Sequence, residues 1–205
     1  FALFATGAPD LTLGSGFASA RAASVTVSFN NTGADQNRTL AMTVGSQTLA
    51  LTNGVTAVSV VGLSATVGGF VQVSGNLALS KQSNEVIAIG SNITARLQAS
   101  GSTFVEVSGA SMGLILGSTS TAVELQGTSL NAQLGSLGGV SAAAVRVRYT
   151  SSGTSVAVSR SLTVGGVGFT FTDGIAAGTT AFSTTTFAAS VSNFVTLSGN
   201  VGFQK

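Results

Sequence analysis

The sequence predicts an all-β protein, built as an elongated β-solenoid. Three observations lead to this prediction: apolar and polar residues alternate with period two, β-branched residues fill many apolar positions, and similar segments recur along the chain. No segment keeps a helical period for about ten residues, and Pro9 is the one proline, so little interrupts strand pairing. The expected strands, bounded by Gly, Ser, Asn or Thr, are Val25–Phe29, Thr48–Leu51, Val58–Val61, Phe70–Val73, Leu77–Leu79, Val86–Ile89, Phe104–Val107, Leu114–Leu116, Val123–Leu125, Val145–Tyr149, Val156–Val158, Phe169–Phe171 and Phe194–Leu197.

A short repeat of roughly 16 to 18 residues, here called a rung, runs along the chain. The segment Phe104–Ser118 begins Phe-Val-Glu-Val-Ser-Gly, and Ala122–Ser136, 18 positions later, begins Ala-Val-Glu-Leu-Gln-Gly. Repetition at a fixed period is the signature of stacked architectures, in which each unit buries its apolar face against its neighbours.

A long repeat relates the two ends of the chain. Val25–Phe29 returns 120 positions later as Val145–Tyr149, and Phe70–Asn76 returns 124 positions later as Phe194–Asn200. Residues 1–81 match residues 121–205, whereas 82–120 occur once. We therefore expect one continuous repeat array over 1–205, comprising about one and two-thirds copies of a unit from a longer chain.

Two architectures fit the rungs. In a solenoid each rung forms one coil, and equivalent residues stack about 4.8 Å apart in apolar ladders. The expected ladders are Val71, Ile87, Val105 and Val123, and then Val73, Ile89, Val107 and Leu125. Alternation then turns Val105, Val107, Val123 and Leu125 inward, with Glu106 and Glu124 outward as direct neighbours. The alternative is an antiparallel β-meander or tandem β-sandwich, in which Ser74-Gly75-Asn76 forms a hairpin loop.

The composition argues against most chemistries. The chain has no cysteine and no histidine, so the thiol nucleophile, the usual general base and the commonest metal ligands are missing. The net charge is +2, charged residues make up 7% of the chain, and the basic residues are scattered, which gives no reason to expect nucleic acid. No apolar run approaches the roughly 18 residues of a membrane-spanning helix. We therefore expect no enzyme, no cofactor, no metal, no nucleic-acid partner and no membrane insertion.

Three groups of polar residues are the candidates for a site. Glu106 and Glu124, with Arg146 in the following rung, form a charged stripe that could serve as a carboxylate pair in glycoside hydrolysis, although a solvated surface is the favoured interpretation. Arg146, Arg148 and Arg160 form the one basic cluster, which could bind anionic polysaccharide or lipid headgroups, although a solvated surface is again the favoured interpretation. The segment Thr179–Phe187 is rich in threonine and could form a flat array. No catalytic, cofactor-binding or metal-binding residue is assigned.

The Phe-Val-x-Val-Ser-Gly-Asn rung at Phe70–Asn76 and Phe194–Asn200, with its period of 120 to 124 residues, resembles the tandem repeats of very large secreted or surface-anchored bacterial proteins of the adhesin or fibre type. The resemblance implies a non-enzymatic structural repeat of an extracellular filament, fibre or adhesin that gives length and rigidity. It implies self-association as the partner interaction and surface glycans as a possible second partner. The alternatives are a polysaccharide-active β-helix enzyme and an ice- or glycan-binding module.

Overall fold

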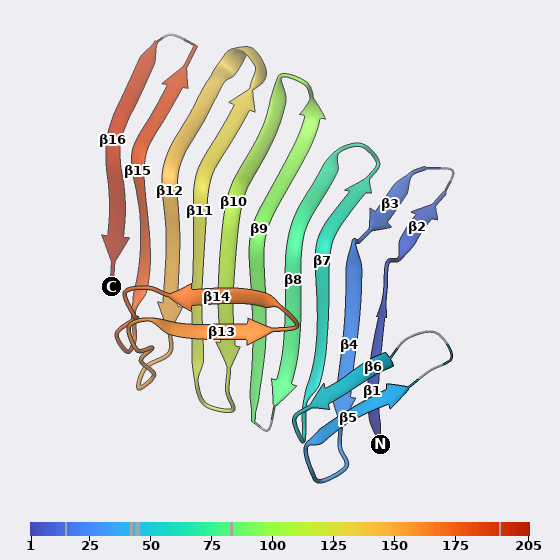
Figure 1. Cartoon of the computed structure of the whole chain (residues 1–205). Coiled ribbons are helices and arrows are strands. Elements are labelled where there is room, and N and C mark those ends of the chain that lie inside the picture. The colour runs from blue at the N-terminus through green and yellow to red at the C-terminus, as the bar shows by residue number, and fades with distance from the viewer. Residues whose placement is uncertain (15, 42, 44–45, 83, 193) are drawn as a thin grey trace.

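A computed structural model describes residues 1–14, 16–41, 43, 46–82, 84–192 and 194–205. These residues form one 12-stranded antiparallel sheet and two separate two-stranded hairpins (Figure 1). The strands are β1 (Ala2–Gly7), β2 (Asp10–Leu13), β3 (Ala18–Arg21), β4 (Ser24–Asn30), β5 (Gln36–Ala41), β6 (Ser46–Leu51), β7 (Thr56–Val67), β8 (Val71–Gln82), β9 (Glu85–Ser100), β10 (Thr103–Leu116), β11 (Thr121–Leu134), β12 (Gly138–Thr150), β13 (Arg160–Val164), β14 (Val167–Phe171), β15 (Thr180–Val191) and β16 (Val195–Gln204). One 3-10 turn, η1 (Gly135–Leu137), joins β11 to β12. The all-β prediction is confirmed.

The predicted solenoid is wrong. The strands follow one another as an antiparallel meander in the order β1-β4-β7-β8-β9-β10-β11-β12-β15-β16. The expected ladders therefore do not form: Val71 pairs with Leu97 of β9, whereas Val123 pairs with Leu114 and Tyr149. A period of 16 to 18 residues suits one coil of a solenoid, but it also suits one long strand with its turn, and here the rung is the strand.

The first two positions of the sheet are each built from two collinear strands. β1 pairs with β4 and β2 pairs with β3, and both β3 and β4 pair with β7. The equivalent strands in the second copy of the long repeat, β11 and β12, are each continuous. The two copies thus fold alike, and the first is interrupted where Pro9 removes a backbone donor.

A row of kinks crosses the sheet at mid-height, where the strands bend in Figure 1. Positive φ angles occur in the middle of β7, β9, β10, β12 and β15, namely at Gly62, Asn92, Gly109, Ala144 and Thr186. Register shifts occur beside these residues in five of the strand pairs. Each shift acts as a β-bulge, which bends a strand and resets its alternation.

The Ser-Gly-Asn motif belongs to this row of kinks, so the hairpin loop that the alternative meander placed at Ser74-Gly75-Asn76 is wrong. Gly75 and Gly199 have φ of 139° and 149° in mid-strand. The side-chain oxygen of Asn76 accepts a hydrogen bond from the amide of Gly62 at 2.8 Å, and Asn200 accepts one from Thr186 at 3.2 Å. The motif recurs in the sequence because it fills one backbone position in both copies.

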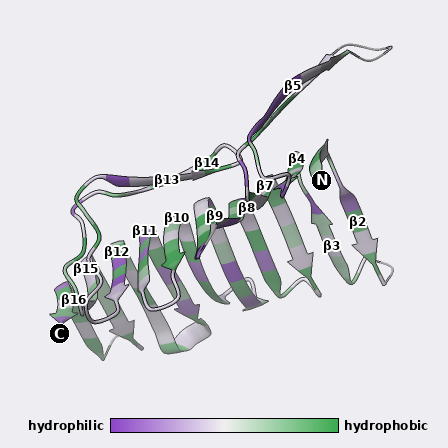
Figure 2. Cartoon of the chain, turned by 90° about the horizontal axis from the view of Figure 1, so that it is seen from below, coloured by the Kyte–Doolittle hydropathy of each residue, from purple (hydrophilic) through white to green (hydrophobic). Residues whose placement is uncertain are grey.

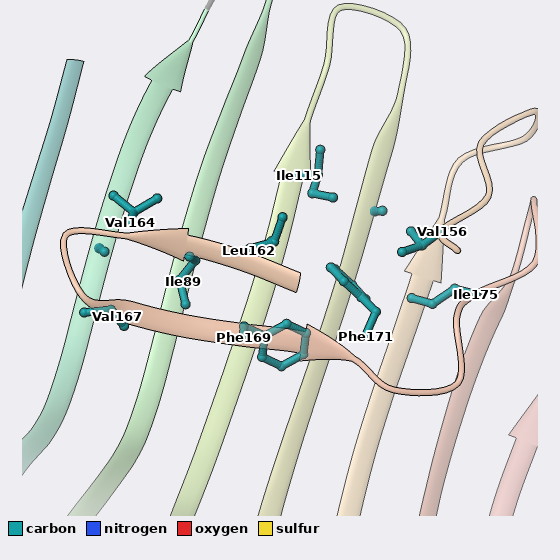
Figure 3. Packing of buried hydrophobic residues seen from close by; sticks show 11 residues of the cluster. Ile89, Ile115, Val156, Leu162, Val164, Val167, Phe169, Phe171 and Ile175 are labelled. Carbon is teal, nitrogen blue, oxygen red and sulfur yellow. The ribbon is translucent and has the colours of Figure 1, made fainter. Parts of the chain in front are cut away.

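The core lies beneath the β13–β14 hairpin, which crosses one face of the sheet (Figures 1 and 3). Gly165 and Gly166, both with positive φ, form its two-residue turn. Alternate residues of the hairpin point down onto the sheet and are buried. The core residues are Ala78, Ile89, Ile115, Ala122, Val156, Leu162, Val164, Val167, Phe169, Phe171 and Ile175.

The β5–β6 hairpin occupies the equivalent place in the first copy. Figure 2 shows it extending away from the sheet past β4, whereas β13–β14 lies along the sheet. Its base is fixed by Asn30, which is 1% exposed and donates to the carbonyl oxygens of Ala34 and Leu51, both at 3.0 Å. Thr150, the equivalent of Asn30, fixes the base of β13–β14 by donating to Ala176 at 2.6 Å.

The predicted burial of the rungs is wrong at its central residues. Glu124 is fully buried, Val105 is 41% exposed, and Val107, Val123, Leu125 and Glu106 are half-buried. Cross-strand pairing places Ser59, Ala78, Ile89, Gly113 and Glu124 in one row, on the face that the hairpin covers. Alternation then puts Val123 and Leu125 on the opposite face. The pattern of the sequence separates the two faces but does not tell which one is covered.

Candidate functional site

A charged cluster lies on the covered face beside the hairpin. It contains Glu124 and Gln126 of β11, Arg146 and Arg148 of β12, and Asp173, which lies two residues after the end of β14. One carboxylate oxygen of Glu124, Oε1, accepts hydrogen bonds from Nε of Arg146, from Nε2 of Gln126 at 2.8 Å and from Nε of Arg148 at 3.4 Å.

Sheet register and the hairpin turn together assemble this cluster. Glu124 pairs directly with Arg148 across β11 and β12, and Gln126 pairs with Arg146 one step further along. The returning hairpin then brings Asp173 over the two arginines. Its Oδ2 accepts from Nη1 of Arg146 at 2.5 Å and from Nη2 of Arg148 at 3.4 Å. Arg146 thus links the covered face of the sheet to the residues that follow the hairpin.

The electrostatics of the cluster favour its charged state. Burial opposes the charge of Arg146, but hydrogen bonds to Asp173 and Glu124 outweigh that cost and raise the pKa of the guanidinium. The hydrogen bond from Arg146, and then its positive charge, lower the pKa of Asp173. Asp173 itself is well exposed, so its pairing with Arg146 is partly screened by water.

Glu124 is the unusual member of the cluster because its side chain is fully buried. Its second oxygen, Oε2, is buried and has no partner among the residues that the structure describes. A buried carboxylate persists when nearby cations and donors compensate for lost water, and here two guanidinium groups and one amide do so. The geometry is that of a structural ion cluster that holds the hairpin to the sheet.

A groove of about 580 Å³ opens next to the cluster. The polar residues that line it are Ser111, Gln126, Thr128, Arg146, Thr172 and Asp173, and the remaining lining residues are Gly109, Gly127, Ala143, Ala144 and Val145. It lies along the row of kinks, because Gly109 and Ala144 of that row are among its lining residues. Hydroxyl, amide and charged groups converge there without an aromatic side chain.

The carboxylate pair proposed from the rungs does not form. Glu106 pairs with Asn131 and Arg96, whereas Glu124 pairs with Gly113 and Arg148. Glu106 instead makes an ion pair with Arg96 at 3.2 Å. The guanidinium of Arg96 also lies over the ring of Phe104, 3.9 Å from its centroid. The two glutamates belong to separate cross-strand clusters, so they are not the neighbours that a glycosidase pair requires.

The expected basic cluster is divided by the fold. Arg146 and Arg148 come together, but both are neutralised by Glu124 and Asp173. Arg160, at the start of β13, lies 3.8 Å from Glu85. Sequence reasoning placed Arg146 with Glu124 in one charged stripe and with Arg148 in one basic cluster. It missed Asp173, which reaches the two arginines through a hairpin that the alternation pattern does not place.

The threonine-rich segment lies mostly in β15 and does not form a flat exposed array. Thr184 is 3% exposed and donates to the carbonyl of Ala143 at 2.8 Å, while Thr186 occupies a kink. In the described part of the chain, no group of three or more His, Cys, Asp or Glu residues is placed to hold a metal ion. Within the same residues no helix is long and apolar enough to cross a membrane.

Comparison with known proteins gives no further assignment of this site. No protein-family model, curated protein or solved structure matches the chain.

Proposed function

We propose that the chain is a non-enzymatic structural repeat of an extracellular filament, fibre or bacterial cell-surface adhesin, to which it gives length and rigidity. The observation that carries the proposal is the way in which the long repeat occupies the sheet. Strands β4, β7 and β8 of one copy and β12, β15 and β16 of the other belong to one continuous sheet rather than to two domains. Each further copy would lengthen that sheet by the same step.

The edges of the sheet support this proposal. Among the described strands, β1 and β16 end the sheet order, and each offers one row of backbone groups to another strand. β16 is exposed along its whole length, with Leu197 60% and Phe203 61% exposed. Natural monomers protect such edges with lysine, proline or short strands. Here the terminal strand is ten residues long and contains neither lysine nor proline, as expected of a strand that receives a partner.

The face opposite the hairpin also suits assembly. Cross-strand pairs place Leu79, Leu114, Val123 and Tyr149 in one row of this face, and Leu79 and Tyr149 are 52% and 42% exposed. Exposed apolar area of this kind marks contact surfaces. A low charge content and the absence of cysteine fit a densely packed fibre whose stability comes from backbone ladders and burial.

Sedimentation velocity over a range of protein concentrations tests the proposal. The wild-type chain is expected to form elongated, concentration-dependent oligomers. Leu197→Lys places a charge on the open β16 edge and should return the chain to a monomer. Val158→Lys is the matched control, because Val158 is 68% exposed but lies in the loop before β13. A compact wild-type monomer at all concentrations, or equal effects of the two substitutions, would contradict the proposal.

The groove beside the charged cluster favours a second candidate, a glycan-binding module. Ser111, Thr128, Arg146 and Asp173 offer donors and acceptors of the kind that bind sugar hydroxyls. Thr172→Phe would fill the groove at an exposed position outside the cluster. If the groove binds glycan, retention on a panel of immobilised polysaccharides should be lost in this variant while its melting temperature is kept.

A further inference from the structure

The two hairpins occupy equivalent places in the repeat but differ in what lies beneath them. Phe169 and Phe171 of β14 are 6% and 0% exposed on the sheet. Their counterparts 120 positions earlier, Leu49 and Leu51, lie in β6 of the hairpin that extends past β4 (Figure 2). Leu51 is buried at the base of the hairpin, whereas Leu49 is half-buried. The β5–β6 hairpin therefore keeps two apolar positions of the covering hairpin, at Leu49 and Leu51. Arg38 pairs with Leu49 where Leu162 pairs with Phe169 in β13–β14. Beyond β4 the hairpin lies off the sheet (Figure 2).

The surface beneath β13–β14 shows what such a hairpin requires. From its base near β12 the hairpin crosses over β10 and β9 to contact β8 and β7. Small residues lie beneath its tip: a Cβ on Gly165 would overlap the side chain of Ser59, and Ala78 is 6% exposed in the covered core. Larger apolar residues, among them Ile89, lie beneath its middle. The sheet surface beneath the hairpin, here called the floor, thus has small side chains beneath the tip of the hairpin and larger ones beneath its middle.

The opposite end of the sheet carries an uncovered surface of the same kind. Ala181 and Ser183 of β15 and Gly202 of β16 stand 124 positions after Ala57, Ser59 and Ala78. Ser183 pairs with Gly202, just as Ser59 pairs with Ala78. Ser183 and Gly202 are exposed and Ala181 is half-buried, whereas Ser59 and Ala78 are buried. β15 and β16 therefore present the floor for the tip of a further hairpin.

We propose that β5–β6 is a clamp that lies across a preceding copy of the same repeat, with its tip on that copy's β15–β16 surface. This inference rests on the proposed function, since it names how successive copies are joined. The occupant is a second copy of this chain's repeat because the covered and the uncovered floors share their small residues at equivalent positions. The clamp and the floor are the two complementary halves of one joint.

The spacing of the joint follows from the hairpin that is already seated. The β13–β14 hairpin starts near β12 and its tip lies on β8 and β7. Beyond β11 it crosses two strands, β10 and β9, before it reaches them. In the first half of the long repeat β1 takes the place of β11, and β16 and β15 of the preceding copy take the places of β8 and β7. The β5–β6 hairpin would therefore cross β1 and then two further strands before its tip reaches β16 and β15 of that copy. Residues 82–120, which occur once in the chain, supply those two strands. Direct pairing of β16 with β1 would omit them and leave the clamp unseated.

A tandem protein tests this joint. It contains two full chains, residues 1–205, connected by a further copy of residues 82–120, so that the period of the repeat is preserved. Trypsin reports on each clamp because Arg38 lies exposed in β5. Cleavage after Arg38 of the upstream and the downstream copy releases fragments of different length. The single chain, with its clamp uncovered, gives the reference rate.

Cleavage at the downstream Arg38 is expected to slow about tenfold or more against the single chain, while the upstream Arg38 is cut at the reference rate. Leu49→Ser should restore fast cleavage when it is placed in the downstream copy and should change nothing in the upstream copy. Equal cleavage of both copies in a rigid, extended particle, as measured by small-angle scattering, would overturn the clamp and leave the proposed function standing. Equal cleavage in two freely jointed units would overturn both.

Discussion

Gly113 of β10 lies directly beneath the ring of Phe169, so closely that a Cβ on this glycine would overlap the ring. Phe169 packs edge-on against Phe171, with ring centroids 5.0 Å apart. The absence of a side chain at Gly113 therefore allows the hairpin to pack this close to the sheet. The glycine is needed here for close packing and not for a turn. Gly113 has no positive φ, unlike the glycines of the kinks and turns.

Gly113→Ala is expected to destabilise the fold by about 1 to 3 kcal/mol, the usual range for overpacking a core. The ring of Phe169 must move away and loses contact with Phe171. Adding Phe169→Leu should recover part of the loss, since the smaller side chain accommodates the new methyl group. Urea denaturation of the two single variants and the double variant measures this coupling, and strictly additive losses would show that the contact is not responsible.

Glu124→Gln is expected to cost about 3 kcal/mol, because it leaves two arginines on a buried floor without their main anion. Glu106→Gln is the matched control. Its ion pair with Arg96 is partly exposed, and its loss should cost less than about 1 kcal/mol. Urea midpoints of the two variants provide the measurement. Equal losses would mean that the buried cluster does not hold the hairpin.

Asp173→Asn is expected to reduce stability at neutral pH but not in strong acid. Because the folded-state pKa of Asp173 is lowered, its stabilising effect is complete above the unfolded-state pKa and disappears as the pH falls through the folded-state value. The difference between wild type and variant should therefore be constant at neutral pH and vanish once the pH has fallen below the lowered folded-state pKa of Asp173. Thermal melts from neutral pH downward give this difference. A gap that persists in acid would exclude the charge of Asp173 as its cause.

Asn76→Ala is expected to cost about 1 kcal/mol, because the amide of Gly62 loses its side-chain acceptor at the kink. Asn200→Ala removes the equivalent bond to Thr186, but on the exposed β16 edge, so its cost should be smaller. Thermal melts of the two variants compare the same bond in two settings. A larger loss for Asn200→Ala would contradict a shared role of the motif in the kinks.

The sequence predicts the strand-forming segments well but not their joining into strands. Phe70–Val73 and Leu77–Leu79 are two expected strands, yet nearly all of their residues lie in the single strand β8 (Val71–Gln82). Gly75 and Asn76 carry the signals of a turn, a glycine and a side-chain acceptor, and a β-bulge uses the same chemistry. Local residues do not separate the two outcomes, because the difference lies in whether the neighbouring strands bend together.

The charged cluster was accessible to sequence reasoning only in part. The alternation of β11 and β12 indicates that Arg146 and Arg148 share a face, and the antiparallel register then brings Glu124 beside them. The burial of Glu124 depends on a hairpin inserted between β12 and β15, whose residues lie tens of positions away in the sequence. Which face of a sheet is covered depends on residues far away in the sequence. The alternation within the strands therefore predicted that the side chain of Glu124 is exposed to water.

The crossing hairpin has a mechanical consequence. The chain ends lie at opposite ends of the sheet, so a pull on them acts across the strands, along the direction of the hydrogen bonds between them (Figure 1). In that direction the hydrogen bonds between two strands break one after another, so a sheet loses one strand at a time. The β13–β14 hairpin runs along the pull and contacts β7, β8, β9 and β10 at once. Before those strands can separate one after another, Phe169 and Phe171 must slide over Ile89, Gly113 and Ile115. The pull must therefore shear the whole interface between the hairpin and the sheet at once, instead of detaching single strands in sequence.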